Sequence, residues 1–244
     1  MATSTLSWFS GGQKTRPGVL YPHAQWWFAL CLVMTWLGFS RSYFAVITSE
    51  PLLHHIHGAL MGGWIVTLIL QPILYQQNRI RLHRTIGKWA VCLLIPAIAV
   101  CGFLMVRNMF RTTHIPPFIV NHLAFLDACS LIQLPVFVAL AVIYARNLNI
   151  HARCIAYTVL MLMPPALARA TQLPGWHVPF ALHVNFAMGL MSLVLLVLIA
   201  DDWRKGKIYW VYPVGFVLNT VAAIAANYAN GWAWWHAVAT WIKG

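Results

Sequence analysis

The sequence predicts an all-α polytopic membrane protein, a transmembrane bundle of about seven helices that forms a single membrane domain over residues 1–244. Hydrophobic residues make up 61% of the chain and charged residues only 8%, which leaves too little polar surface for a water-soluble fold. Seven apolar stretches approach the roughly 20 residues that a bilayer requires. Most basic residues lie at every second connection between these stretches, a pattern typical of multi-pass membrane proteins.

The expected spans are, in chain order, 24–44, 55–76, 86–106, 116–145, 154–170, 178–200 and 208–228. The fifth span is short and contains Pro164-Pro165, which predicts a break in that helix. A Trp-rich tail, 231–242, is too short to cross the bilayer again and is expected in the membrane interface. Six or eight spans are the alternatives.

The distribution of Lys and Arg predicts the orientation. The N-terminal segment and the connections 77–88, 146–153 and 201–207 hold 11 of the 16 basic residues, and the opposite side holds five. By the positive-inside rule, the N-terminus is therefore expected in the cytoplasm and the C-terminus outside. Because the basic residues form no continuous face or arm, nucleic acid is not an expected partner.

The histidines are distributed unevenly on this topology. Eight histidines are predicted on the outer side of the membrane or in the outer halves of the spans: His54, His55, His57, His114, His122, His177, His183 and His236. Prolines open the second, fourth and sixth spans, and His57, His122 and His183 follow within six residues, roughly 6–9 Å below the outer helix ends. If these helices are neighbours, the three imidazoles and His55 converge on a site for copper, zinc or a b-type haem. The alternative is that they only hydrogen-bond to lipid, water or a neighbouring helix.

Asp127 is the only acidic residue deep inside a predicted span. A carboxylate at that depth is costly unless it is protonated, paired or exposed to water, so it indicates a functional site. Arg169 and Arg41, with Tyr43, are its expected neighbours in an intramembrane polar site. A structural clamp between Asp127 and an arginine is the alternative.

A third set of candidate residues lies at the cytoplasmic connections: His83, Arg84, His151, Arg153 and Asp202. They are expected to contact anionic lipid headgroups or to stabilise the turns. An internal site built from His83, His151 and Asp201 is the alternative. Transmembrane b-type cytochromes carry histidine pairs on facing helices near both membrane faces, but here the inner histidines are expected in loops, which argues against that comparison.

Short motifs are spread along most of the chain: Ser42-Tyr43-Phe44, His55-x-His57-Gly58, Leu82-His83-Arg84-x-x-Gly87 and His151-x-Arg153, with Trp64, Gln71, Asp127, Arg169 and Asp202 between or after them. Together they resemble a family of uncharacterised multi-spanning proteins of the bacterial inner membrane. The resemblance implies a helical membrane protein in that membrane and no known reaction. His122 and His183 are not part of the family pattern.

The sequence leaves three functions open. The first is a redox or metal-dependent membrane protein with a histidine site on the outer face. The second is an accessory subunit of a larger membrane complex, for which the 13 tryptophans supply an aromatic surface. The third is a transporter of a small molecule or proton, which depends on Asp127, Arg169 and the Pro164-Pro165 break. Membrane lipids are the expected partners in each case, and neither a reaction nor an enzyme class follows from the residues.

Overall fold

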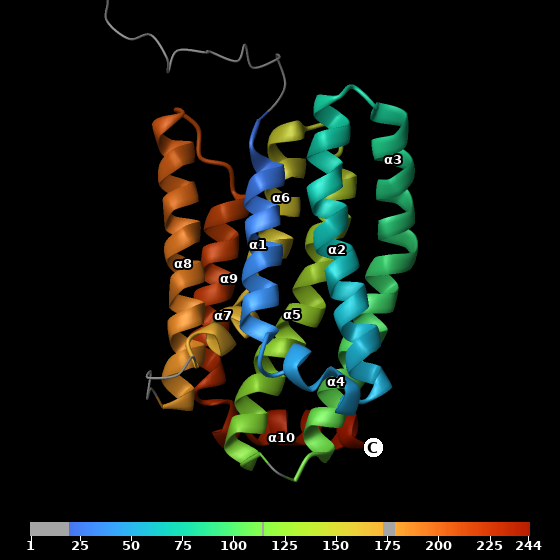
Figure 1. Cartoon of the computed structure of the whole chain (residues 1–244). Helices are drawn as coiled ribbons and strands as arrows, with labels where there is room; N and C mark the ends of the chain where they lie inside the picture. Colours follow the sequence, from blue (N-terminus) through green and yellow to red (C-terminus); the bar gives the residue numbers. More distant parts are fainter. Residues whose placement is uncertain (1–19, 114, 173–178) are drawn as a thin grey trace, which may run out of the picture.

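The computed structural model describes residues 20–113, 115–172 and 179–244. Within these ranges the chain is mainly helical, with no strand, and the long helices run up and down as a bundle (Figure 1). The predicted all-α fold is therefore confirmed. In chain order the elements are α1 (Ala24–Phe39), η1 (Phe44–Ser49), α2 (Leu52–Gln76), α3 (Ile80–Trp89), η2 (Ala90–Leu94), α4 (Ile95–Arg111), α5 (Pro117–Ile143), α6 (Leu148–Leu160), α7 (Pro164–Ala170), α8 (Phe180–Arg204), α9 (Val211–Ala226), η3 (Ala229–Gly231) and α10 (Ala233–Lys243).

Five helical stretches of the described chain are long and apolar enough to cross a bilayer: Leu52–Gln76, Ile80–Arg111, Pro117–Ile143, Leu148–Ala170 and Leu182–Arg204. The helices α1 and α9 are apolar but have only 16 residues each. These lengths fit an integral, multi-pass membrane protein. The number of seven spans and the orientation of the termini stay predictions.

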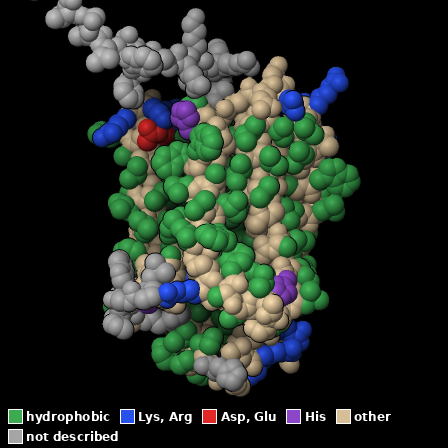
Figure 2. Space-filling view, in the orientation of Figure 1, with side chains coloured by type: hydrophobic (Ala, Val, Ile, Leu, Met, Phe, Trp, Pro, Cys, Tyr) green, Lys and Arg blue, Asp and Glu red, His purple; other side chains and the backbone are tan. Residues whose placement is uncertain are grey.

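The surface agrees with contact to lipid. On the face shown in Figure 2, hydrophobic side chains cover the middle of the molecule, whereas charged side chains gather toward its two ends. Large apolar side chains such as Trp27, Leu93 and Val197 are at least 60% exposed. A surface of this kind is unfavourable in water and is stabilised by hydrocarbon, so the protein would contact membrane lipids.

The helix ends differ from the predicted spans. The predicted connections 77–88 and 146–153 are largely helical, because α3 begins at Ile80 and α6 begins at Leu148. Asn78 closes the turn before α3 with a φ of 60°. Arg and Lys are good helix formers whose long side chains reach the headgroups from a helix, so charge does not end these helices. His83 and His151 therefore lie in helices, and the expectation that they lie in loops is wrong.

The stretch from Ile80 to Arg111 is one continuous helix with a π-helical turn, η2, at its centre. A π-turn holds one residue more than an α-turn and is frequent at functional sites. In the fifth predicted span the expected break is present, because α6 ends at Leu160 and α7 begins at Pro164. The short helix α7 can approach α1 closely because Gly38 faces it: a Cβ at Gly38 would lie 2.2 Å from the carbonyl oxygen of Ala166.

The Trp-rich tail forms a separate helix, α10, which lies across one end of the bundle (Figure 1). Trp235 is buried there, and its ring packs edge-on against Phe125 of α5, with the ring centroids 5.2 Å apart. Aromatic pairs of this kind stabilise contacts beyond the area that they bury. The tail therefore packs onto the bundle as well as lying at its end.

Candidate functional site

Two histidines from different helices meet near one end of the bundle. His83 lies in the first turns of α3 and His151 in the first turns of α6, and their ring centroids are 6.4 Å apart at an interplanar angle of 63°. Both side chains are partly buried. Tyr75 of α2 packs against His83, with its ring 6.0 Å away. We call His83 and His151 the inner histidine pair.

Each imidazole of the inner pair is oriented by a backbone carbonyl. The Nδ1 of His83 donates to the carbonyl of Gln71 at 3.3 Å, and the Nδ1 of His151 donates to the carbonyl of Ala141 at 2.8 Å. A proton on Nδ1 leaves the lone pair of a neutral imidazole on Nε2. Histidines that bind metals are commonly held in this way, with one nitrogen fixed by the protein and the other free for the metal.

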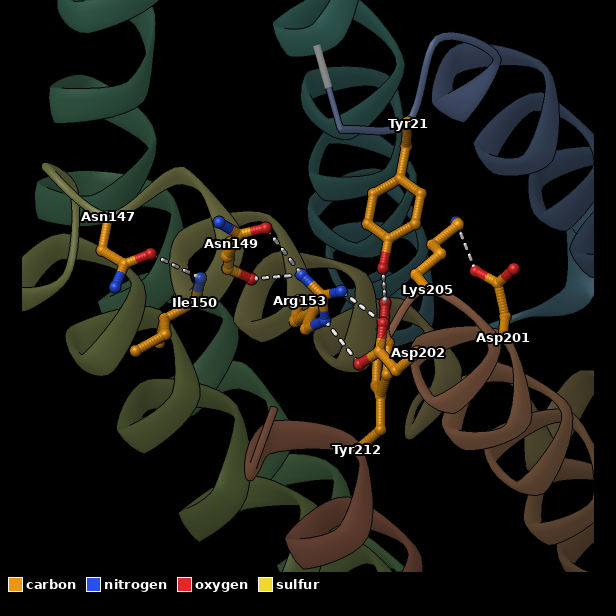
Figure 3. A network of polar contacts seen from close by, with 9 residues as sticks. All are labelled: Tyr21, Asn147, Asn149, Ile150, Arg153, Asp201, Asp202, Lys205 and Tyr212. Atoms are coloured by element: carbon orange, nitrogen blue, oxygen red, sulfur yellow. Dashed lines mark hydrogen bonds and ion pairs between the residues drawn. The ribbon is translucent and has the colours of Figure 1, made fainter. Parts of the chain in front are cut away.

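Beside His151, a buried ion pair joins α6 to α8. The Arg153 guanidinium donates through Nε to Oδ2 of Asp202 at 2.8 Å and through Nη2 to Oδ1, while its Nη1 donates to the carbonyl of Asn149 at 2.8 Å (Figure 3). The two charged side chains are only 2% and 0% exposed. Both charges are thus buried inside the protein, between α6 and α8.

Tyrosines surround this ion pair. The Arg153 guanidinium lies 4.1 Å from the ring centre of Tyr209, and the hydroxyls of Tyr21 and Tyr212 are 3.0 Å apart beside Asp202 (Figure 3). Burial raises the pKa of Tyr21, so its hydroxyl is protonated at neutral pH. We call Arg153, Asp202 and these tyrosines the Arg–Asp clasp. It fixes the first turns of α6, and hence the position of His151, two residues before Arg153.

Sequence reasoning did not identify the clasp as a buried unit, although it singled out Arg153 and Asp202. The tyrosines come from the segment before α1 and from the start of α9, which are far apart in the chain. Asp201, the other candidate neighbour of the inner pair, bonds instead to Lys205 on the surface. Arg84 is exposed and interacts electrostatically with His83.

At the opposite end of the bundle, the outer histidines His57, His122 and His183 lie on α2, α5 and α8. These three helices pack mainly against other helices and not against one another. The helix α2 packs mainly against α1 and α4, α5 against α4, α6 and α9, and α8 against α9 and α7. Within the described ranges, no three His, Cys, Asp or Glu side chains are placed to hold one metal ion. The hypothesis that His57, His122 and His183 converge thus gains no support. His114 and His177 lie outside the described residues.

Two of the outer histidines are hydrogen-bonded to neighbouring side chains. The Nδ1 of His55 lies 2.6 Å from the Tyr43 hydroxyl, and the Nδ1 of His183 lies 2.7 Å from Oγ1 of Thr171. His54 pairs with Glu50 one turn earlier in the chain. Contacts of this kind are expected if the outer histidines hydrogen-bond to neighbouring parts of the protein and do not bind a metal.

His57 and His122 differ, because each keeps a buried nitrogen without a partner among the described residues. For His57 this atom is Nδ1, and for His122 it is Nε2. Burying a polar atom without a hydrogen bond costs free energy and needs an explanation such as a ligand or an ordered water. Nearby, Asn121 Oδ1 and Trp235 Nε1 are likewise buried without a partner among the described residues, so the feature is not confined to the histidines.

The predicted intramembrane polar site of Asp127, Arg169, Arg41 and Tyr43 stays a prediction. Arg169, at the end of α7, interacts electrostatically with Asp127 and with His57. Leu123 and Leu126, on the same helix as Asp127, pack against the buried cluster of α7 and α8. Nevertheless, Asp127 makes no ion pair within 4 Å among the described residues, and Arg41 is exposed without an interaction with it. Tyr43 bonds to His55 instead.

Comparison with known proteins adds no family assignment. The motif resemblance to uncharacterised bacterial inner-membrane proteins therefore stays a prediction. The chain matches no protein-family model, no curated protein and no solved structure.

Proposed function

We propose that this chain is a b-type haem protein of the membrane that takes part in electron transfer, with His83 and His151 as the residues that would hold an inner haem. The observation that carries the proposal is that two imidazoles from different helices lie side by side, with their ring centroids 6.4 Å apart. Imidazole is a common ligand of haem iron.

The hydrogen bonds of the pair support the same assignment. Both Nδ1 atoms are held by carbonyls of other helical segments, Gln71 and Ala141, which favours the tautomer that offers Nε2 to iron. Arg84 lies close enough to interact with His83 and would pair with a haem propionate at the membrane surface. The Arg–Asp clasp holds α6 rigidly behind His151, as a redox site requires.

Haem supplies reversible one-electron chemistry when it is bound. The proposal assigns no haem to the outer half, because His57 of α2 and His122 of α5 lie on helices that pack mainly against other helices.

The test is the visible spectrum of the purified full chain, made in cells supplied with a haem precursor and freed of any histidine tag. We expect stoichiometric haem whose absorption bands sharpen on reduction with dithionite. His83→Gly and His151→Gly should each lose the inner haem, and added imidazole should restore it where the variant is folded. His236→Gly is the matched control, because the His236 side chain bonds to the carbonyl of Asn230, far from the inner pair, and the variant should leave the spectrum unchanged. Folded wild-type protein without haem would refute the proposal.

Transport of a proton or small solute is a second candidate, favoured by the carboxyl of Asp127, which has no ion pair within the described part of the chain. The discontinuous helices α6 and α7 also suit a transporter. Proteoliposomes loaded with a pH-sensitive dye separate the two functions. Proton flux in haem-free protein that is lost in Asp127→Asn would favour transport.

A further inference from the structure

A small cavity lies between the end of α1 and the end of α7, at the end of the bundle opposite the inner histidine pair. Its volume is about 70 Å³, and its polar lining is Ser40, Arg41, Ser42, Arg169 and Gln172. Gly38 forms part of its wall, where the absence of a side chain allows α1 and α7 to approach. The polar groups thus come from two segments that are more than 120 residues apart in the chain.

The lining carries two positive charges and no carboxylate. Arg169 stacks on the ring of Phe39 at 4.7 Å and donates through Nη1 to the carbonyl of Pro165 at 3.0 Å, which fixes the plane of its guanidinium. Its remaining N–H groups are available to a ligand. Arg41 has no hydrogen bond or ion pair among the described residues, and Asp127 lies beyond ion-pair distance of both arginines.

Neutral donors complete the lining. The side chains of Ser42 and Gln172 make no hydrogen bond within the described ranges, whereas the Ser40 hydroxyl donates to the carbonyl of Leu37. Two guanidiniums with a hydroxyl and an amide around one small space match the acceptor pattern of an oxyanion. Asp127 interacts electrostatically with Arg169, whereas Arg41 has no counter-charge within 4 Å among the described residues.

We propose that this cavity binds a small oxyanion, a carboxylate or a phosphate group, through Arg41 and Arg169. The site is separate from the inner histidine pair, so it does not depend on the haem proposal. The phosphate could belong to a free solute or to the headgroup of an anionic lipid, because both present the same acceptor atoms to the two arginines. The arms of the experiment distinguish these sources.

The first arm measures equilibrium binding of radioactive inorganic phosphate, and separately of acetate, to the full chain purified in a neutral detergent. The second arm measures retention of phosphatidylglycerol by native mass spectrometry from nanodiscs that contain equal amounts of phosphatidylglycerol and phosphatidylcholine. Binding in the first arm identifies a free anion, and retention only in the second identifies a lipid headgroup. In the arm that is positive, Arg41→Gln should weaken binding at least tenfold.

The control is Arg111→Gln, which removes one charge at the same end of the bundle from a residue that donates to the carbonyl of Lys243 outside the cavity. It should change binding by less than twofold. Arg41→Gln concerns an exposed side chain and is expected to fold, so the test does not depend on a variant of Arg169. No binding in either arm, or equal weakening by Arg111→Gln, would overturn the proposal.

Discussion

Arg153 and Asp202 form two parallel hydrogen bonds between α6 and α8 in a place from which water is excluded (Figure 3). A buried ion pair is stabilising only when both charges and their remaining donors have partners, because burial itself costs several kcal/mol per ion. Here the carbonyl of Asn149 and the ring of Tyr209 supply those further partners for Arg153. The geometry of α6 near His151 therefore depends on this pair.

Replacing one member of this pair should destabilise the protein strongly. In Arg153→Gln or Asp202→Asn, the charge that remains is buried without its counter-ion, which costs about 3 to 5 kcal/mol. Thermal unfolding in detergent, followed by tryptophan fluorescence, measures the loss. The exposed pair of Lys205 and Asp201 provides the control, because Lys205→Gln should cost less than about 1 kcal/mol. Equal effects of the two changes would contradict the buried role of Arg153.

The contact between α1 and α7 should not tolerate a side chain at Gly38. A Cβ there would lie 2.2 Å from the backbone oxygen of Ala166, so Gly38→Ala must push two helices apart and should cost about 1 to 3 kcal/mol. Gly62→Ala is the matched variant on α2, because no atom lies within 4 Å of a Cβ at that position. It should leave the melting temperature unchanged or raise it. A stable Gly38→Ala variant would show that α7 packs less closely than described.

The sequence predicted the helical class and the approximate position of every long helix because apolar stretches of membrane length are unambiguous. It gave His83 and His151 only as part of an alternative internal site with Asp201, since the basic residues around them resemble loops in a hydropathy profile. The carbonyls of Gln71 and Ala141 that orient these rings belong to the backbone and leave no mark in the sequence. Conversely, His57, His122 and His183 match in depth, but depth alone does not make their helices neighbours.

The orientation can be checked by labelling. Gln77→Cys places a thiol in the exposed turn between α2 and α3, on the side predicted to be cytoplasmic. In a background without the five native cysteines, a membrane-impermeant maleimide should label this thiol only after the cells are opened. A cysteine at Ser49, in the connection at the opposite end of α2, should react in intact cells. The reverse result would invert the predicted topology and exchange the inner and outer levels.

Asp127 should affect function more than fold. Asp127→Asn retains the shape of the side chain and removes its charge, while Arg169 keeps its hydrogen bond to Pro165 and its contact with Phe39. We therefore expect a folded protein with altered activity in the dye or electron-transfer assay, and a change in melting temperature of a few degrees at most. If Asp127→Asn and Asp127→Leu both behave as wild type in either assay, the carboxyl has no functional role.

The π-turn η2 sets the helical phase of the longest helix. An α-helix turns by about 100° per residue. On a regular helix, the buried face of α4, which includes Ile98 and Val106, would be offset by about 100° from the face that carries His83 of α3 and Ala90 at the start of η2. The extra residue of the π-turn compensates for this offset, so both halves face the bundle. Deleting Cys92 would restore a regular helix and turn one half toward lipid. The π-turn thus aligns each half of this helix with the bundle separately. Adding or removing one residue at the turn would rotate one half relative to the other by about 100°.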